Sequence, residues 1–183
     1  IFSLNQRTYE LEKDLSMVEL ILRKKLIHFN NKKIIFDTNI YDEIVKDNLT
    51  LEDLKLAKKK GFRFFMTHIQ NDEINEIKDQ DKEKRALLHL FIHEIKPDIL
   101  PTDSFVLGVS RNNYAKLNKD RSILESLKGN SKNIRSNKDA LIGEVAINNK
   151  LVLVTKDNTF RRRVQNLGGT ALDLTEFKLY IYD

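Results

Sequence analysis

The stretch Leu151-Val152-Leu153-Val154-Thr155-Lys156-Asp157 joins a run of four apolar residues to a polar turn that ends in an acid. A short apolar run of this kind, rich in β-branched residues, predicts a strand buried on both faces. A second run, Lys33-Ile34-Ile35-Phe36, leads in the same way into Asp37-Thr38-Asn39. Each acid therefore follows a buried strand and precedes a helix, as in a parallel sheet with helical connections.

Outward from these two strands, strand-like and helix-like segments alternate. Further strands are expected over residues 62–66, 98–100 and 170–172. Helices are expected over residues 40–48, 50–60, 67–77, 80–95, 103–118, 120–128, 138–149 and 158–167, with Thr102 or Asp103 capping the 103–118 helix and a polar loop over residues 129–137. The pattern predicts an α/β fold, a three-layer sandwich around a central, mostly parallel five-stranded sheet.

An extra N-terminal helix is expected over residues 6–29, where apolar residues recur at steps of three and four. Its stripe either caps the domain core or docks on a partner. We therefore divide the chain into an N-terminal helical extension, residues 1–31, and a main domain, residues 32–183. Because the chain opens at Ile1 rather than Met, we expect it to be trimmed or to be the C-terminal part of something longer.

Composition excludes several classes of protein. Cysteine is absent, which rules out disulfides, thiolate metal sites and a cysteine nucleophile and suits a reducing cytoplasm. No apolar run approaches the roughly 20 residues of a membrane span, and the charged N-terminus does not resemble a secretory signal. The expected location is the cytoplasm, with no membrane partner.

Positive charge is concentrated in one segment. The net charge is +5, yet residues 111–138 hold eight basic and two acidic residues, a net of +6. Such a segment on a near-neutral body is typical of a surface that binds a polyanion, although a solvated, lysine-rich loop has the same composition. Residues 119–136 within it resemble an insert.

Four acids stand where the predicted fold can gather them. Asp37 and Asp157 are delivered to one edge of the sheet, the edge at which open parallel sheets bind ligands. Glu73 lies on the helix after the second strand, and Asp139 opens the helix before the fourth. Carboxylates suit Mg²⁺ or Mn²⁺, which prefer oxygen ligands. Each acid taken alone is equally explained as a helix cap or a solvated charge.

Four motifs in this order resemble those of the PIN-domain nucleases. Ile34-Ile35-Phe36-Asp37-Thr38-Asn39 is similar to the family's opening strand with its D-T-N ending. The segment from Thr67 to Glu73 resembles the second motif, and Asp139-Ala140-Leu141-Ile142-Gly143 resembles the third. Leu153-Val154-Thr155-Lys156-Asp157, followed by Phe160, resembles the fourth. The likeness covers roughly residues 32–175, and the N-terminal helix and the basic insert depart from it.

The resemblance implies a phosphodiester-cleaving enzyme that uses Mg²⁺ or Mn²⁺ to activate water, with RNA a more common substrate than DNA. Asp37, Asp139 and Asp157 would hold the metal, directly or through water. Glu73 would complete the site and accept the proton of the attacking water. Asn39 would orient Asp37 by a hydrogen bond, and Thr155 would do the same for Asp157.

Other residues have two open interpretations. Arg135, Lys138 and the run Arg161-Arg162-Arg163 either contact the phosphate backbone or form solvated helix faces. His68 either approaches the site or is a polar surface residue. Tyr114 either stacks on a base or packs. His89 and His93 have the i, i+4 spacing of metal ligands, but their helix faces the core and lacks the motif that would support this role.

Three functions remain open at this point. The first is a metal-dependent endoribonuclease with a role in RNA processing. The second is the same activity as the toxin of a toxin–antitoxin pair, whose partner would dock on the basic segment or on the leucine stripe, a stripe that also suits a homo-oligomer. The third is a non-catalytic PIN-like module that binds RNA or protein. An aspartyl-phosphate phosphatase is excluded because Asn39 stands where its second Asp is required.

Overall fold

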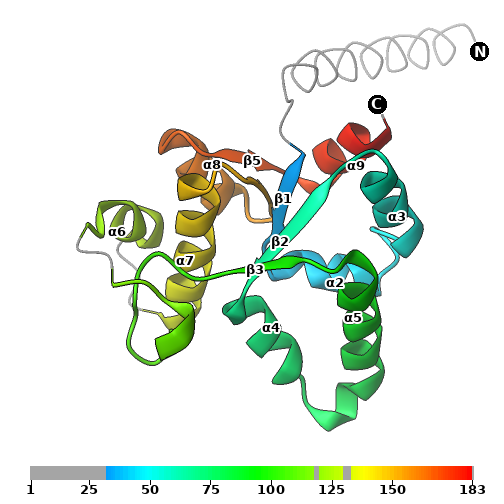
Figure 1. Ribbon diagram of the computed structural model, residues 1–183, viewed down its shortest axis with the longest axis horizontal. Coiled ribbons are helices and arrows are strands. Elements are labelled where there is room, and N and C mark those ends of the chain that lie inside the picture. Colours follow the sequence, from blue (N-terminus) through cyan, green and yellow to red (C-terminus); the bar gives the residue numbers. More distant parts are fainter. Residues whose placement is uncertain (1–31, 118–119, 130–132, 183) are drawn as a thin grey trace, which may run out of the picture.

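Five parallel strands form the centre of the computed structural model, which describes residues 32–117, 120–129 and 133–182 (Figure 1). The strands are β1 (Lys33–Phe36), β2 (Arg63–Thr67), β3 (Asp98–Leu100), β4 (Val152–Val154) and β5 (Thr170–Leu172). Their order across the sheet is β3-β2-β1-β4-β5, and every neighbouring pair is parallel. The predicted fold class is confirmed, and the sheet is parallel throughout.

Helices cover both faces of this sheet. They are α2 (Asn39–Val45), α3 (Leu51–Lys59), α4 (His68–Asn75), α5 (Lys82–Ile95), α6 (Ser122–Lys128), α7 (Ile134–Asn148), α8 (Asn158–Asn166) and α9 (Leu174–Tyr182). In Figure 1, α2, α3, α5 and α9 lie on the right of the sheet, and α6, α7 and α8 lie on the left. The result is a three-layer α/β/α sandwich.

Alternation along the strands divides the core into two clusters. Ile34 and Phe36 of β1 pack toward α2, α5 and α9, whereas Ile35 between them packs toward α6, α7 and α8. Phe36 is the aromatic centre of the first cluster, since its ring meets Phe64 at 5.6 Å and Phe177 at 5.5 Å. The strands are buried on both faces, which is why they read as continuous apolar runs.

The expected helix over residues 103–118 is wrong. Residues 103–117, the part of this segment that the structure describes, are irregular except for a short 3₁₀ turn at Asn112–Tyr114. Thr102 and Ala115 form an isolated bridge, with the amide of Thr102 donating to the carbonyl of Tyr114 at 2.8 Å. Serine, asparagine and Gly108 weaken a helix here, and buried polar contacts replace it. Ser104, for example, donates to Glu144 on α7 at 2.7 Å.

The boundary of α7 was also misjudged. The predicted loop over residues 129–137 is too long, because α7 begins at Ile134 rather than near residue 138. The side chain of Asn133 caps the helix by accepting from the amide of Arg135 at 3.1 Å. Asp139 therefore lies in the second turn of α7 and does not open it.

Helix α9 has no counterpart among the predicted elements. It buries Phe177, Tyr180 and Ile181 against the first core cluster. The expected N-terminal helix, residues 6–29, lies outside the described residues. Among the helices that the structure does describe, none has the length and apolar character of a segment that crosses a membrane.

Candidate functional site

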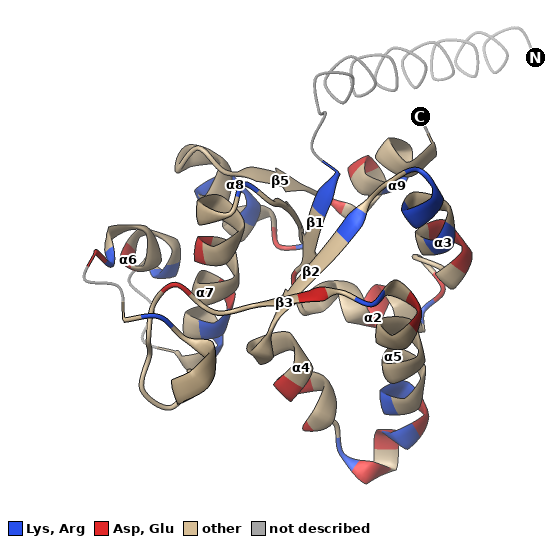
Figure 2. Ribbon diagram, in the orientation of Figure 1, with Lys and Arg blue, Asp and Glu red and all other residues tan. Residues whose placement is uncertain are grey.

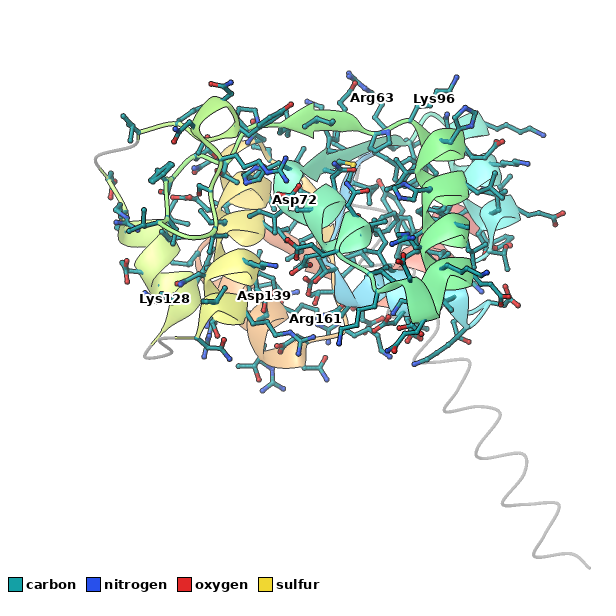
Figure 3. The ribbon with its side chains drawn as sticks, turned by 90° about the horizontal axis from the view of Figure 1, so that it is seen from below. Arg63, Asp72, Lys96, Lys128, Asp139 and Arg161 are labelled. Carbon is teal, nitrogen blue, oxygen red and sulfur yellow. The ribbon has the colours of Figure 1, made fainter. Side chains whose placement is uncertain are left out.

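The carboxyl ends of β1 and β4 bring Asp37 and Asp157 to one edge of the sheet. The two strands are neighbours, with Phe36 paired to Val154 in register. The amide of Asp37 donates to the carbonyl of Val154 at 2.9 Å, which carries this pairing one residue beyond β1. Figure 3 looks at this edge from below, with Asp139 of α7 labelled near the centre of the view. The expected meeting point of two acids is therefore present.

Asp37 is held by three hydrogen bonds. Its Oδ1 accepts from the amide of Thr38 at 2.8 Å. Its Oδ2 accepts from the side-chain amide of Asn39 and from the hydroxyl of Thr155, each at 2.6 Å. The predicted hydrogen bond from Asn39 to Asp37 is thus observed. Thr155 was expected to orient Asp157, and its side chain instead orients Asp37.

Burial and neighbouring acids act on the Asp37 carboxyl together. The side chain is nearly inaccessible, at 2% exposure. Burial raises its pKa above the ordinary value, the hydrogen bonds from Thr155 and Thr38 oppose that rise, and the charges of Asp157 and Glu73 add to it. A bound cation would therefore offset the negative charges of Asp37, Asp157 and Glu73.

Asp157 follows β4 at this edge of the sheet, and its carboxyl group also caps helix α8. It is the N-cap of α8, where Oδ1 accepts from the amides of Thr159 at 2.8 Å and Phe160 at 2.9 Å. The hydroxyl of Thr155 also accepts from the amide of Asp157 at 3.0 Å, so Thr155 contacts both acids. Both capping bonds are made to Oδ1, and the residue is exposed.

Asp139 approaches the same group of acids from α7. Its pKa is raised to about 7, mainly by burial and then by the charges of Asp37 and Glu73, while Arg135 lowers it. Within the described part of the chain it has no hydrogen bond or ion pair. A half-buried acid without a partner, beside other acids, is a functional candidate with a physical basis.

Glu73 reaches the site from α4, and a lysine faces it. Lys138 of α7 places its Nζ 2.9 Å from Glu73 Oε1 and 4.0 Å from Glu76 Oε2. Lys138 was expected to bind nucleic acid, and here it forms an ion pair inside the site. This pair joins α4 to α7 across the group of acids.

Residues of the right kind for a hard divalent cation are therefore present, but they are not gathered as ligands. No three His, Cys, Asp or Glu side chains of the described segments stand close enough to hold an ion. Mg²⁺ keeps several waters and needs only one or two carboxylates, so Asp37 with Asp139 or Asp157 fits its donor requirements. Burial first, and then the charges of the other acids, raise the pKa values of Asp37 and Asp139.

The basic candidates fall into two groups. Arg161 is paired with two carboxylates rather than available to a substrate. Its Nη1 lies 2.6 Å from Asp173 Oδ2 and 2.8 Å from Glu176 Oε2. Arg163 donates to the carbonyl of Leu127 at 3.0 Å. Arg135 and Arg162 are exposed. Figure 2 shows basic residues in blue on α6, on the lower part of α7 and on α8.

The remaining candidates lie around α4 and α5. His68 is 3% exposed and its ring centroid lies 5.8 Å from that of Tyr114, so the interpretation as a polar surface residue is wrong. Burial lowers its pKa. Tyr114 is 43% exposed. His89 and His93 are on α5, which packs against α2, α3 and α4.

Sequence reasoning missed two residues that shape the site. Tyr41 is buried on α2, where burial and the charges of Asp37 and Glu73 raise its pKa. Gln70 donates to the carbonyl of Phe36 at 2.9 Å, which ties α4 to the end of β1 next to Asp37. The spacing of Tyr41 four residues after Asp37 was the available signal for the first. Gln70 had only its place in a capping box with Thr67.

A comparison with protein-family models finds no match, and a comparison with curated proteins likewise finds none.

Proposed function

We propose that this chain is a PIN-like, metal-dependent endoribonuclease that cleaves phosphodiester bonds at the edge of the sheet marked by Asp37, Glu73, Asp139 and Asp157. The observation that supports it most directly is the Asp37 cradle. A nearly inaccessible carboxylate held by Thr38, Asn39 and Thr155, with its pKa raised by burial and by neighbouring acids, is an unfavourable arrangement for stability alone.

The acids require a positive partner before they can meet an anionic substrate. A divalent cation bound here supplies the charge that offsets the phosphate, and it lowers the pKa of a water so that it can attack phosphorus. Asp37, Asp139 and Asp157 hold this cation, directly or through water. The amide of Thr38 holds Oδ1 of Asp37, and Asn39 and Thr155 hold Oδ2, which reduces the reorganisation needed on binding.

Glu73 and the arginines complete the assignment. Glu73 accepts the proton of the attacking water from the α4 side, where Lys138 holds its carboxylate. Arg135 and Arg162 contact the phosphate backbone, since both are exposed on helices that carry or follow an acid of the site. These contacts are independent of base sequence.

The direct test is cleavage of single-stranded and structured RNA with Mn²⁺ by the wild type and by Asp37→Asn. Asp37→Asn keeps the shape of the side chain and removes its charge, so cleavage is expected to fall by at least about 100-fold with little change in thermal stability. The matched control is Asp98→Asn, an exposed acid at the start of β3 that pairs with Arg63 at the opposite edge of the sheet.

Equal cleavage by the wild type and Asp37→Asn would disprove the assignment. If the wild type binds RNA without cutting it, and Mn²⁺ at millimolar concentration does not bind, the non-catalytic module becomes the better description. DNA of the same sequence, assayed in parallel, identifies the preferred polymer.

A further inference from the structure

A cavity of about 680 Å³ lies beside the acids. It is bounded by α2, by the turn between β4 and α8, and by α9. Its lining includes Lys156, Asn158, Leu174, Lys178, Leu179 and Tyr182. Its volume is within the range of sites that hold small molecules and single nucleotides, roughly 300–1,000 Å³.

One turn of the chain links the lining of the cavity to the candidate site. Lys156 and Asn158 line it, and Asp157 lies between them in the sequence. The amide of Lys156 donates to Oδ1 of Asn39 at 3.1 Å, and Asn39 in turn donates to Asp37. A polymer whose phosphodiester lies at the acids therefore has this cavity next to it.

One wall of the cavity is a fixed aromatic ring with apolar neighbours. Leu174, Lys178 and Tyr182 recur every four residues along α9 and so share a face, with Leu179 beside them. The Tyr182 side chain is 59% exposed, yet its hydroxyl donates to Asp53, a buried carboxylate of α3. An exposed ring whose orientation is fixed at its far end is suited to stacking.

The opposite wall presents hydrogen-bond donors. Lys156 places its Nζ 2.7 Å from Glu43 Oε1, which fixes the ammonium and leaves donors available, since it has three. Asn158 is the first residue of α8, an exposed amide at the positive end of the helix. Lys178 is occupied with the carbonyl of Asn48 at 3.2 Å and with Asp53 at 3.6 Å.

Charge in the cavity is nearly balanced, because Glu43 and Asp173 offset Lys156 and Lys178. A balanced cavity does not favour a multiply charged anion such as a nucleoside triphosphate. It does suit a flat, neutral group against the aromatic wall and a single negative charge at the donors. A nucleotide within a strand has both parts.

We propose that this cavity binds one unpaired nucleotide of the substrate strand, with its base on Tyr182, Leu174 and Leu179 and its phosphate toward Lys156 and Asn158. The inference rests on the proposed function, because it takes the substrate to be a polynucleotide at the adjacent acids. A base that stacks here has left its own partner, so the site selects single-stranded substrate over duplex.

The test measures binding of a short fluorescent single-stranded RNA by anisotropy in EDTA, so that no cleavage occurs. Tyr182→Ala is expected to weaken binding by roughly 5- to 100-fold, the range for loss of one base stacked on an aromatic ring. Tyr182→Phe keeps the ring and is expected to bind within about threefold of the wild type. Leu90→Ala is the control, since Leu90 is an exposed apolar residue of α5 that lies outside this cavity.

A second readout locates the base directly. RNA with one 4-thiouridine, irradiated in the complex, is expected to crosslink within α9 in the wild type and to lose that crosslink in Tyr182→Ala. Duplex RNA is expected to give neither the crosslink nor the dependence on Tyr182. Single-stranded DNA that behaves like RNA would show that the cavity recognises the base and phosphate rather than the ribose.

The outcomes separate the two proposals. Unchanged binding in Tyr182→Ala with crosslinks elsewhere overturns the nucleotide site, even if Asp37→Asn abolishes cleavage and the nuclease assignment stands. Tyr182-dependent binding without any Mn²⁺-dependent cleavage overturns the nuclease assignment and keeps the site. Failure of the wild type to bind any single-stranded oligonucleotide, in an otherwise folded protein, overturns the nucleotide site as well.

Discussion

Thr155 is the residue on which the geometry of the acids depends most. Its hydroxyl donates to Asp37, accepts from the amide of Asp157, and lies 3.2 Å from the side-chain amide of Asn39. It is buried, at 1% exposure. The hydroxyl of Thr155 therefore sets the relative positions of Asp37, which follows β1, and Asp157, which follows β4. From the sequence alone, Thr155 was expected to orient only Asp157.

Thr155→Val removes this hydroxyl and preserves the shape of the side chain. Affinity for Mn²⁺, measured by calorimetry, is expected to fall by about 10- to 100-fold, the usual cost of losing a group that orients a metal ligand. Thr170→Val, a half-buried threonine at the start of β5, is the control. Unchanged affinity in Thr155→Val would mean that Thr38 and Asn39 are enough to orient Asp37.

Asp139 makes a second prediction at this scale, on stability. Its pKa of about 7 in the folded protein exceeds the value of 3.8 that applies when it is unfolded. The folded state therefore binds more protons between these values, and stability is lost as pH rises through about 7. In the metal-free protein, Asp139→Asn is expected to be more stable than the wild type at about pH 8, by on the order of 1–2 kcal/mol after allowance for solvent screening.

Thermal unfolding of both proteins in EDTA at about pH 8 and about pH 5 checks this. The gain should shrink at the lower pH, where Asp139 is protonated. His68 titrates in the opposite sense, because burial lowers its pKa and acid therefore destabilises the fold. The variant is for this reason compared with the wild type at each pH. A gain that does not depend on pH would contradict the assignment.

At the scale of elements, α7 carries Asp139 and must pack closely to place it. Gly143 lies where α7 meets α6 and α8. A β-carbon at this position would stand 2.9 Å from Phe160 Cζ and 3.0 Å from Leu127 Cδ1. The small residue after Asp139-Ala140-Leu141-Ile142 is therefore required by the packing of three helices, and Phe160 is the aromatic residue that fills the space.

Gly143→Ala is expected to destabilise the fold by on the order of 1–2 kcal/mol, since crowding outweighs the better helix propensity of alanine. Urea unfolding measures the effect. Asn137→Ala, a half-buried position on the same helix, is the control and should be close to neutral. A neutral or stabilising Gly143→Ala would show that Phe160 and Leu127 move aside at little cost.

Packing of this kind also explains which elements the sequence could predict. Strands β3 and β5 match their predicted bounds because apolar runs between turns have few alternatives. The segment 103–118 failed because its Asp103 and Ser104 bond to Lys116, Asn148 and Glu144, contacts with residues distant in the chain. Helix α9 was missed because six of its nine residues are apolar and only Thr175, Glu176 and Lys178 interrupt them, so its helical period is weak.

At the scale of the whole molecule, lysine and arginine side chains lie around the acids, but some of these acids have no such partner among the described residues. Lys138 and Lys156 are paired with Glu73 and Glu43, and Arg161 is paired with Asp173. Exposed Arg135 and Arg162 are the better candidates for phosphate contacts. At least one side chain of each pair is largely buried, so these pairs fix the directions of the side chains.

Arg162→Gln tests this distribution. Removing one phosphate contact is expected to reduce the slope of log Kd against log salt concentration by roughly 0.7 for single-stranded RNA. The free energy of unfolding should change little, because the residue is exposed. Arg63→Gln, at the start of β2 on the opposite edge of the sheet, should leave the slope unchanged. Equal slopes for Arg162→Gln and wild type would remove Arg162 from the interface.

The sequence by itself determined the alternating α/β pattern, the parallel sheet and the acids that follow β1 and β4. These features follow from local periodicity and from the rule that parallel strands share a carboxyl edge. Only the tertiary structure decided the partners of the polar and charged side chains. Lys138 pairs with Glu73, Arg161 pairs with Asp173 and Glu176, and Thr155 donates a hydrogen bond to Asp37. The sequence does not show which residue a charged side chain pairs with, because the pairing depends on how helices far apart in the chain pack together. The cavity under α9 has the same origin, since its walls come from three elements far apart in the chain.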